Sequence, residues 1–198
     1  MFLENTINHA KQSGWMEVIC GSMFSGKTEE LIRRLRRAEM AGLNVEIFKP
    51  KIDNRYSEED VVSHNKNKIR STAVESTSEI LLLGSNCDVV GIDEAQFFDE
   101  SIVEVANQLA NNGVRVVIAG LDMDFLGRPF GPMPNLMATA EYVTKVHAIC
   151  RRTGNLANYS MRISSGKDIV EIGETDSYEA VSRRVFVDEV LNKDPHKQ

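Results

Sequence analysis

The chain has 198 residues, 42% of them hydrophobic and 26% charged, which is the composition of a soluble globular domain with room for a small appendage. Its net charge of -6 argues against broad binding to a nucleic acid backbone, although a nucleotide pocket can be locally positive in an acidic protein. No apolar run approaches ~18 residues and residues 1–14 lack a signal-peptide pattern, so we expect no membrane contact and a cytoplasmic location. The cysteines Cys20, Cys87 and Cys150 are widely spaced, which favours reduced thiols over a disulfide framework.

The first predicted elements surround a phosphate-binding pattern that follows a polar arm at residues 1–14, which we expect to be flexible. An apolar strand at residues 15–20 leads into a loop that fits G-x-x-x-x-G-K-[ST], and a helix follows at residues 28–41. In such a loop backbone N–H groups surround a phosphate, the lysine approaches the β- and γ-phosphates, and the hydroxyl binds Mg²⁺. The residues of the pattern are Gly21, Ser22, Met23, Phe24, Ser25, Gly26, Lys27 and Thr28. The alternative is an ordinary glycine turn with a solvated lysine.

Four arginines on this helix lie away from its apolar stripe: Arg33, Arg34, Arg36 and Arg37. They are expected either to form a solvated face or to contact a partner subunit or a nucleotide. Charge patterning alone leaves both interpretations open.

A second strand is predicted at residues 44–48, and a polar stretch at residues 51–71 follows it. A stretch of this length without periodicity is uncommon in a compact domain, so it is expected either to have a function or to be disordered. A short helix is predicted next at residues 76–83, with Ser76 or Thr77 as its N-cap.

The apolar stretch at residues 87–92 reads as a strand that ends in two adjacent carboxylates, Asp93 and Glu94. In enzymes with a phosphate-binding loop, an aspartate at this position holds Mg²⁺ directly or through water. Adjacent residues at a strand end point in different directions, so one carboxylate can serve the metal and the other can act as a base. The alternative is a pair of solvated turn acids.

The remaining pattern alternates helices and strands until residue 149 and then changes character. The predicted elements are a helix at 99–112, a strand at 114–119, a short helix at 135–140, a strand at 142–149, and later pieces at 159–163, 168–172 and 178–187. Alternating elements indicate a parallel sheet with helices on both faces. Since ligands bind beyond the carboxyl ends of such strands, the phosphate loop, Asp93, Glu94 and residues 121–125 should converge on one site.

Three motifs together resemble the cytosolic (type II) thymidine kinases. They are the loop at residues 21–28, the segment Asp-Glu-Ala-Gln-Phe-Phe at 93–98, and the segment at 121–131. The late segments 170–173 and 178–181 also resemble that family, and the similarity runs in order from residue 17 to about residue 186.

The resemblance implies transfer of the ATP γ-phosphate to the 5′-hydroxyl of thymidine, giving dTMP for nucleoside salvage and DNA synthesis. It implies Glu94 as the general base and Thr28 with Asp93 at Mg²⁺. The implied nucleotide side comprises the phosphate loop with Asp53, Arg55, Asp93, Glu94, Ala95 and Gln96. The implied thymidine side comprises Met23, Phe97, Leu121, Phe125, Tyr178 and the "lasso" residues Ile169, Val170, Glu171, Ile172 and Gly173. A homotetramer and feedback inhibition by dTTP are further implications.

The expected fold class is therefore α/β, with a P-loop NTPase (RecA-like) parallel sheet flanked by helices and a small C-terminal lasso domain. The expected boundaries are residues 15–146 for the α/β domain, 147–190 for the lasso domain and 191–198 for a flexible tail.

The sequence departs from the family at its structural zinc site, which usually has four ligands in two Cys-x-x-Cys or Cys-x-x-His pairs. In this sequence only the first of the four positions has a residue that can bind zinc, Cys150. The other three positions hold Thr153, Ser182 and Val185. These three residue types do not bind structural zinc, so we expect none. The base of the lasso is then expected to be held by packing of Ile149, Val181 and Val185 and by neighbouring subunits.

Two other functions are compatible with a phosphate loop. A RecA-like P-loop ATPase that acts on nucleic acid has only the arginine-rich helix in its favour, and the acidic net charge against it. An inactive nucleotide-binding subunit is disfavoured by the intact Lys27, Thr28, Asp93 and Glu94.

Overall fold

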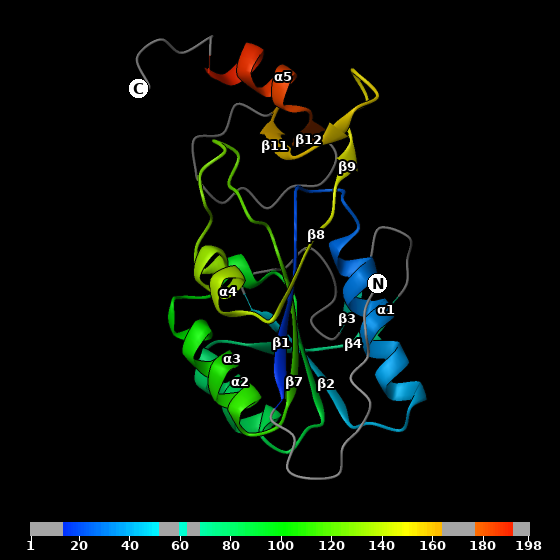
Figure 1. The fold of residues 1–198 in the computed structure, drawn as a ribbon, viewed down its shortest axis with the longest axis vertical. Coiled ribbons are helices and arrows are strands. Elements are labelled where there is room, and N and C mark those ends of the chain that lie inside the picture. Colours follow the sequence, from blue (N-terminus) through cyan, green and yellow to red (C-terminus); the bar gives the residue numbers. More distant parts are fainter. Residues whose placement is uncertain (1–13, 52–59, 63–67, 164–176, 192–198) are drawn as a thin grey trace.

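A computed structural model describes residues 14–51, 60–62, 68–163 and 177–191 of the chain. Its centre is a six-stranded sheet in the order β5-β2-β6-β7-β1-β8, in which every neighbouring pair is parallel (Figure 1). The strands are β1 (Trp15–Cys20), β2 (Val45–Pro50), β5 (Thr72–Val74), β6 (Val89–Ile92), β7 (Arg115–Gly120) and β8 (Tyr142–Lys145). The predicted parallel sheet is confirmed.

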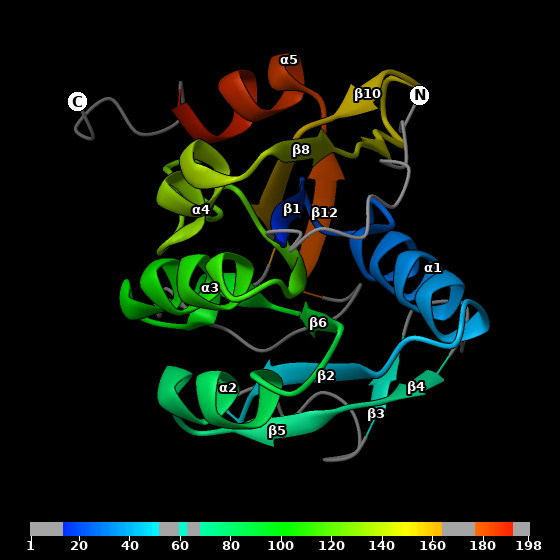
Figure 2. The same cartoon turned by 60° about the horizontal axis from the view of Figure 1, so that its bottom comes forward.

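The central strands are apolar and β-branched because both faces of the sheet are covered. In β7, every residue from Val116 to Gly120 is buried, and β6 is buried along its whole length. Helix α1 (Lys27–Met40) covers one face, while α2 (Thr77–Gly84), α3 (Ser101–Asn111) and α4 (Met133–Thr139) cover the other (Figure 2). This three-layer arrangement gives the sheet two hydrophobic cores, one on each face.

Local sequence signals explain where two of the helices begin. Helix α2 starts after Ser76, whose side chain and that of Glu79 form a reciprocal capping box. Helix α1 starts after Gly26, which has the left-handed φ of +84° that glycine adopts without strain. Its apolar positions Leu31, Ile32, Leu35 and Ala38 all face the sheet.

The chain after the sheet forms a small C-terminal subdomain beyond the carboxyl end of β1 (Figure 1). It consists of two antiparallel pairs, β9 (Ala148–Ile149) with β10 (Leu156–Ala157) and β11 (Tyr159–Arg162) with β12 (Tyr178–Val181), then α5 (Arg183–Phe186) and a last turn, η2 (Val187–Leu191). Its core includes Cys150, Met161 and Val181, and the ring of Phe186 stacks on Tyr159 with centroids 4.3 Å apart.

Several predicted boundaries were wrong. The strand expected at 142–149 is two strands, because the Val146 N–H still donates to Cys20 at 2.8 Å but the chain then leaves the sheet to pair Ala148 with Ala157. The polar stretch at 51–71 was expected either to have a function or to be disordered, and its described residues include β3 (Asp60–Val62) and β4 (Lys68–Arg70), an antiparallel pair.

Other expectations fall outside the described residues or concern single side chains. The arm at residues 1–13, the strand at 168–172 and the tail at 192–198 lie outside them. Ile149 was expected to pack under the lasso, but 60% of it is exposed because the short β9 turns it away from the subdomain core. No helix among the described residues is long and apolar enough to cross a membrane.

Candidate active site

The phosphate-binding loop joins β1 to α1, as its pattern predicts. Gly21 has a φ of +146°, and a Cβ there would lie 2.1 Å from the Val146 carbonyl oxygen, so only glycine fits. At Gly26 a Cβ would meet nothing closer than Glu29 Oε2 at 3.8 Å, which leaves open space at the start of α1. Phe24 also has a positive φ, of 61°, a strained conformation for an aromatic residue that is typical of functional loops.

Inside the loop, two side chains donate to one carbonyl. Lys27 Nζ lies 2.8 Å from the Ser22 oxygen, and Ser25 Oγ lies 2.7 Å from the same atom. The lysine is thus folded over the loop, and the backbone conformation that would surround a phosphate is formed.

The small subdomain also holds the loop. Ser22 is buried and its hydroxyl donates to the Ala157 carbonyl at 3.2 Å. The Met23 N–H donates to Ser160 Oγ at 2.9 Å. The sequence patterns did not single out Ala157 or Ser160, because neither contact comes from a motif and both span more than a hundred residues of chain.

The predicted magnesium ligands lie together. Thr28 Oγ1 donates to Asp93 Oδ2 at 3.3 Å, although the two residues are separated by 65 positions in the chain. Asp93 is 6% exposed and follows β6, so its carboxylate is fixed at the carboxyl edge of the sheet. A hydroxyl and a carboxylate are the oxygen ligands that Mg²⁺ prefers, so these residues fit the ion.

Glu94 is the next residue after Asp93, but its side chain has a different partner. Its φ is +52°, and its N–H donates to Asp93 Oδ1 at 2.9 Å. The carboxylate of Glu94 instead accepts from Gln96 Nε2 at 2.5 Å, and Gln96 Oε1 accepts from the Leu121 N–H at 2.9 Å. The two adjacent acids therefore have separate surroundings, as expected for a metal ligand and a base. Ala95 and Gln96 are both buried in the short turn η1 (Ala95–Phe97).

Aromatic residues from three segments form two clusters. Phe97 meets Phe130 edge to face, with ring centroids 5.8 Å apart. The guanidinium of Arg162 lies 4.0 Å from the centroid of Phe125, and its Nη2 donates to the Tyr178 hydroxyl at 2.7 Å. Phe125 and Tyr178 are thus brought together by an arginine that sequence reasoning missed, since a lone Arg in a short strand carries no motif.

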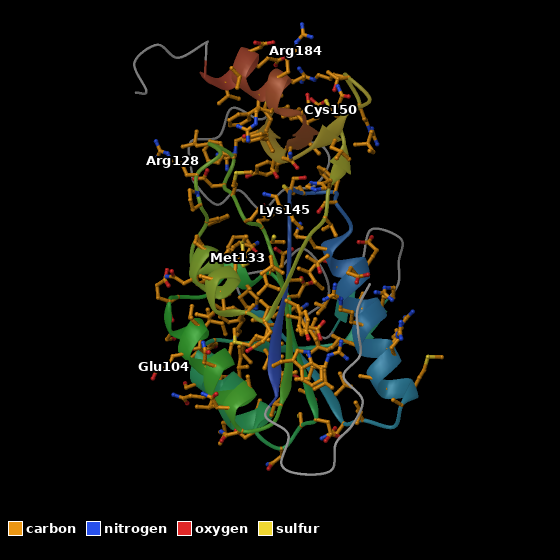
Figure 3. All side chains as sticks on the ribbon, in the orientation of Figure 1. Glu104, Arg128, Met133, Lys145, Cys150 and Arg184 are labelled. Carbon is orange, nitrogen blue, oxygen red and sulfur yellow. The ribbon has the colours of Figure 1, made fainter. Side chains whose placement is uncertain are left out.

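An ion pair joins the end of β8 to the segment that follows β7. Lys145 Nζ, at the end of β8, lies 2.5 Å from Asp122 Oδ2, whose side chain is 6% exposed, and Figure 3 labels Lys145 below the small subdomain. Next to it, burial raises the pKa of the Cys20 thiol to about 11, and the nearby Asp122 charge adds to the rise. Cys20 is therefore a protonated core residue, as its apolar strand predicts.

A cavity of about 690 Å³ opens between the phosphate loop and the small subdomain. Phe24, Ser25 and Gly26 line it from the loop, and Tyr178 and Arg151 line it from the subdomain. Asp53, Arg55 and residues 169–173, which were expected at the site, lie outside the described residues.

The former zinc positions lie together but do not fit a metal. Thr153 Oγ1 donates to Ser182 Oγ at 3.4 Å, and Val185 packs against the apolar core that contains Cys150. Burial raises the pKa of the Cys150 thiol, but hydrogen bonds from Thr153, Ser182 and Arg152 outweigh it and lower the pKa from 9.0 to about 7. In the described part of the chain, no three His, Cys, Asp or Glu side chains are grouped to hold a metal.

We therefore predict that the purified protein contains far less than one zinc per chain and that EDTA does not change its melting temperature in the absence of substrates. Hydrogen bonds and packing, rather than a metal, connect these positions. Elemental analysis with thermal melting checks this, and stoichiometric zinc that resists dialysis would contradict it.

The arginine-rich face of α1 is not uniformly solvated, which corrects the simpler of the two interpretations. Arg34 is 3% exposed, and its guanidinium pairs with Glu17 and Glu30, each at 2.8 Å. Arg33 is exposed and also pairs with Glu30. Because Glu17 and Glu30 neutralise Arg34, and Glu30 also pairs with Arg33, the case for a nucleic acid contact is weaker.

The chain is similar to known thymidine kinases over most of its length. A thymidine kinase family profile matches residues 14–186. The thymidine kinase of Bacteroides thetaiotaomicron is 58% identical over 187 residues, which cover 94% of this chain and 94% of that protein. The thymidine kinase of Porphyromonas gingivalis (strain ATCC BAA-308 / W83) is 61% identical over 184 residues, which cover 93% of this chain and 90% of that protein.

Among solved structures, the genome packaging NTPase B204 of Sulfolobus turreted icosahedral virus 2, in complex with ATP-gammaS, aligns with a TM-score of 0.48 at 13% identity. That alignment covers 72% of this chain and 79% of the other. The family profile spans nearly all the described residues, and it includes both strand ends that carry the candidate site. The chain therefore belongs to the thymidine kinase family.

Proposed function

We propose that this protein transfers the γ-phosphate of ATP to the 5′-hydroxyl of thymidine, giving ADP and dTMP. The observation that carries the proposal is the convergence of Thr28, Asp93 and Glu94 at one edge of the sheet in a member of the thymidine kinase family. Phosphoryl transfer needs positioning and charge stabilisation more than covalent chemistry, and these residues supply both.

On the nucleotide side, the N–H groups of residues 21–28 and the Lys27 ammonium hold the phosphates. Thr28 and Asp93 would hold Mg²⁺, which would neutralise charge on the phosphate oxygens when bound. Asp53, Arg55, Ala95 and Gln96 belong to the same side of the proposed site. ATP is the proposed donor in this region, and dTTP is the proposed feedback inhibitor.

On the nucleoside side, aromatic and apolar residues form a slot for a flat base with a methyl group. Phe97, Leu121 and Phe125 form one wall, and Met23 and Tyr178 belong to the other. Residues 169–173 would complete the slot with backbone groups. Glu94 accepts the proton of the 5′-hydroxyl as the phosphoryl group arrives.

A homotetramer and a cytoplasmic location are part of the proposal. Three free cysteines are compatible with a reducing compartment. A nucleic acid-stimulated ATPase, the alternative from the sequence, has no comparable support.

The test is ATP consumption by the purified protein with Mg²⁺ and one of four acceptors: thymidine, deoxyuridine, deoxycytidine or single-stranded DNA. We expect ADP and dTMP to form in equal amounts with thymidine and no stimulation by DNA. Chromatographic separation of the products checks the result. Turnover that depends on DNA, or ADP formed without dTMP, would overturn the proposal.

A further inference from the structure

The side chain of Gln96 lies between the proposed base and the wall of the proposed nucleoside slot. Its Nε2 donates to Glu94 Oε2 at 2.5 Å, and its Oε1 accepts from the Leu121 N–H at 2.9 Å. An ionised carboxylate can only accept and a backbone N–H can only donate, so these two partners determine which way the amide points.

Packing keeps this side chain in place. Gln96 is 2% exposed, and a Cβ at Gly120 would come within 2.9 Å of its Oε1. A Cβ at Gly131 would lie 2.5 Å from the Gln96 carbonyl oxygen. Gly120 thus lets β7 approach the side-chain amide, which has little freedom to rotate, and Gly131 lets its own segment approach the backbone of Gln96.

The consequence concerns Glu94, whose backbone is strained at φ +52°. One carboxylate oxygen accepts from the amide, which restricts the orientation of the carboxylate. The same amide accepts from the Leu121 N–H. A single side chain therefore determines the position of the Glu94 carboxylate relative to Leu121 in the proposed nucleoside slot. A misplacement of about 1 Å at such a position can cost on the order of a hundredfold in rate.

We propose that Gln96 is a positioning residue that orients the Glu94 carboxylate toward the acceptor hydroxyl and links it to the Leu121 backbone. This role is separate from contact with the nucleotide, which the sequence comparison implied for Gln96. The inference rests on the proposed function, because it assigns Gln96 a role relative to Glu94 as the base.

Two variants separate the two hydrogen bonds. Gln96→Met removes both, whereas Gln96→Glu keeps an acceptor for the Leu121 N–H and places a second carboxyl group, in place of the amide donor, against the Glu94 carboxylate. We expect each to lower kcat with thymidine by roughly tenfold to a hundredfold, the effect of losing a hydrogen bond to a charged group. If Gln96 acts through Glu94, the KM for ATP should stay within about twofold, and a larger rise would show that Gln96 contacts the nucleotide instead.

The decisive comparison places Gln96→Met in a Glu94→Gln background. If Gln96 acts through Glu94, the second change should cost little once the carboxylate is gone, so the two effects should be strongly non-additive. Gln108→Met is the matched control, since Gln108 on α3 also donates its amide to a glutamate, Glu104 at 3.3 Å, but on the exposed surface. It should leave kcat unchanged.

The outcomes separate the inference from the function on which it rests. An unchanged kcat in Gln96→Glu, or fully additive losses, overturns the positioning role even if Glu94→Gln is inactive. An unchanged kcat in Glu94→Gln would instead remove the base itself. Thermal melting of each variant shows whether it is folded. If Gln96→Met does not fold, the kcat of Gln96→Glu decides the question.

Discussion

Replacing Glu94 by glutamine is expected to lower turnover of thymidine by roughly 10² or more while ATP binding remains, the size of effect seen when a general base is removed. An amide cannot take the proton of the 5′-hydroxyl, yet it has nearly the same shape as the carboxylate. Gln96 can still donate to its oxygen, so the local geometry is kept. Thr28 and Asp93, the proposed ligands of Mg²⁺, are unaltered.

Steady-state kinetics with thymidine, together with calorimetric titration of ATP, measures this effect. Glu104→Gln is the matched control, because Glu104 is an exposed residue of α3 on another part of the molecule. The control should retain full activity. Full activity in Glu94→Gln as well would show that the proton leaves by another route.

The second large effect concerns stability. We expect Arg34→Met to lower the free energy of unfolding by about 3–5 kcal/mol, because it removes one member of a buried charge network. Arg34 Nη1 pairs with Glu17 on β1, and its Nη2 donates to Thr144 on β8 at 3.0 Å. Glu17, 2% exposed, also pairs with Arg115 on β7 at 2.7 Å. The network therefore joins α1 to three strands.

Urea unfolding at neutral pH, monitored by circular dichroism, measures the difference. Arg33→Met is the matched control, since Arg33 is the neighbouring residue and shares Glu30 but forms an exposed pair. Such pairs contribute at most about 1 kcal/mol. If both variants lost a similar free energy of unfolding, the buried network would stabilise the protein no more than an exposed ion pair does.

The pH dependence of the same measurement follows from Glu17. Burial raises the pKa of Glu17, but Arg115, Trp15 and Arg34 outweigh it and hold the pKa below its ordinary value of 4.5. A lowered folded-state pKa gives stability that is present above pH 4.5 and is lost as the pH falls through the folded-state pKa. The difference in the free energy of unfolding between the wild type and Arg34→Met should therefore become smaller as the pH falls below 4.5.

Local patterns were sufficient to predict much of the sheet and the phosphate loop. Strands such as β1 and β7 are mostly apolar, with one charged residue each, and the glycine spacing before Lys27 has few structural alternatives. The approach of Thr28 to Asp93 could also be predicted, because parallel strands end at a common edge. These features depend on the periodicity of apolar residues and on the spacing of motif residues, both of which can be read from a single sequence.

The remaining features depend on contacts between distant residues. Nothing near Arg162 in the sequence indicates that it joins Phe125 to Tyr178, and nothing near Arg34 indicates that Glu17 will neutralise it. Likewise, the chain alternates smoothly through residues 142–149, although the pairing partner changes from β1 to β10 within that stretch. Such outcomes are decided by which surfaces meet after folding.

The two hydrogen bonds from Ser22 and Met23 to the small subdomain limit how this protein can be recombined with its relatives. The nucleotide loop belongs to the first part of the chain, but Ala157 and Ser160 from the last part help to hold its shape. A chimera that exchanged only the C-terminal segment would change the support of the phosphate loop together with the nucleoside slot. The two parts therefore depend on each other for function, although they have separate hydrophobic cores.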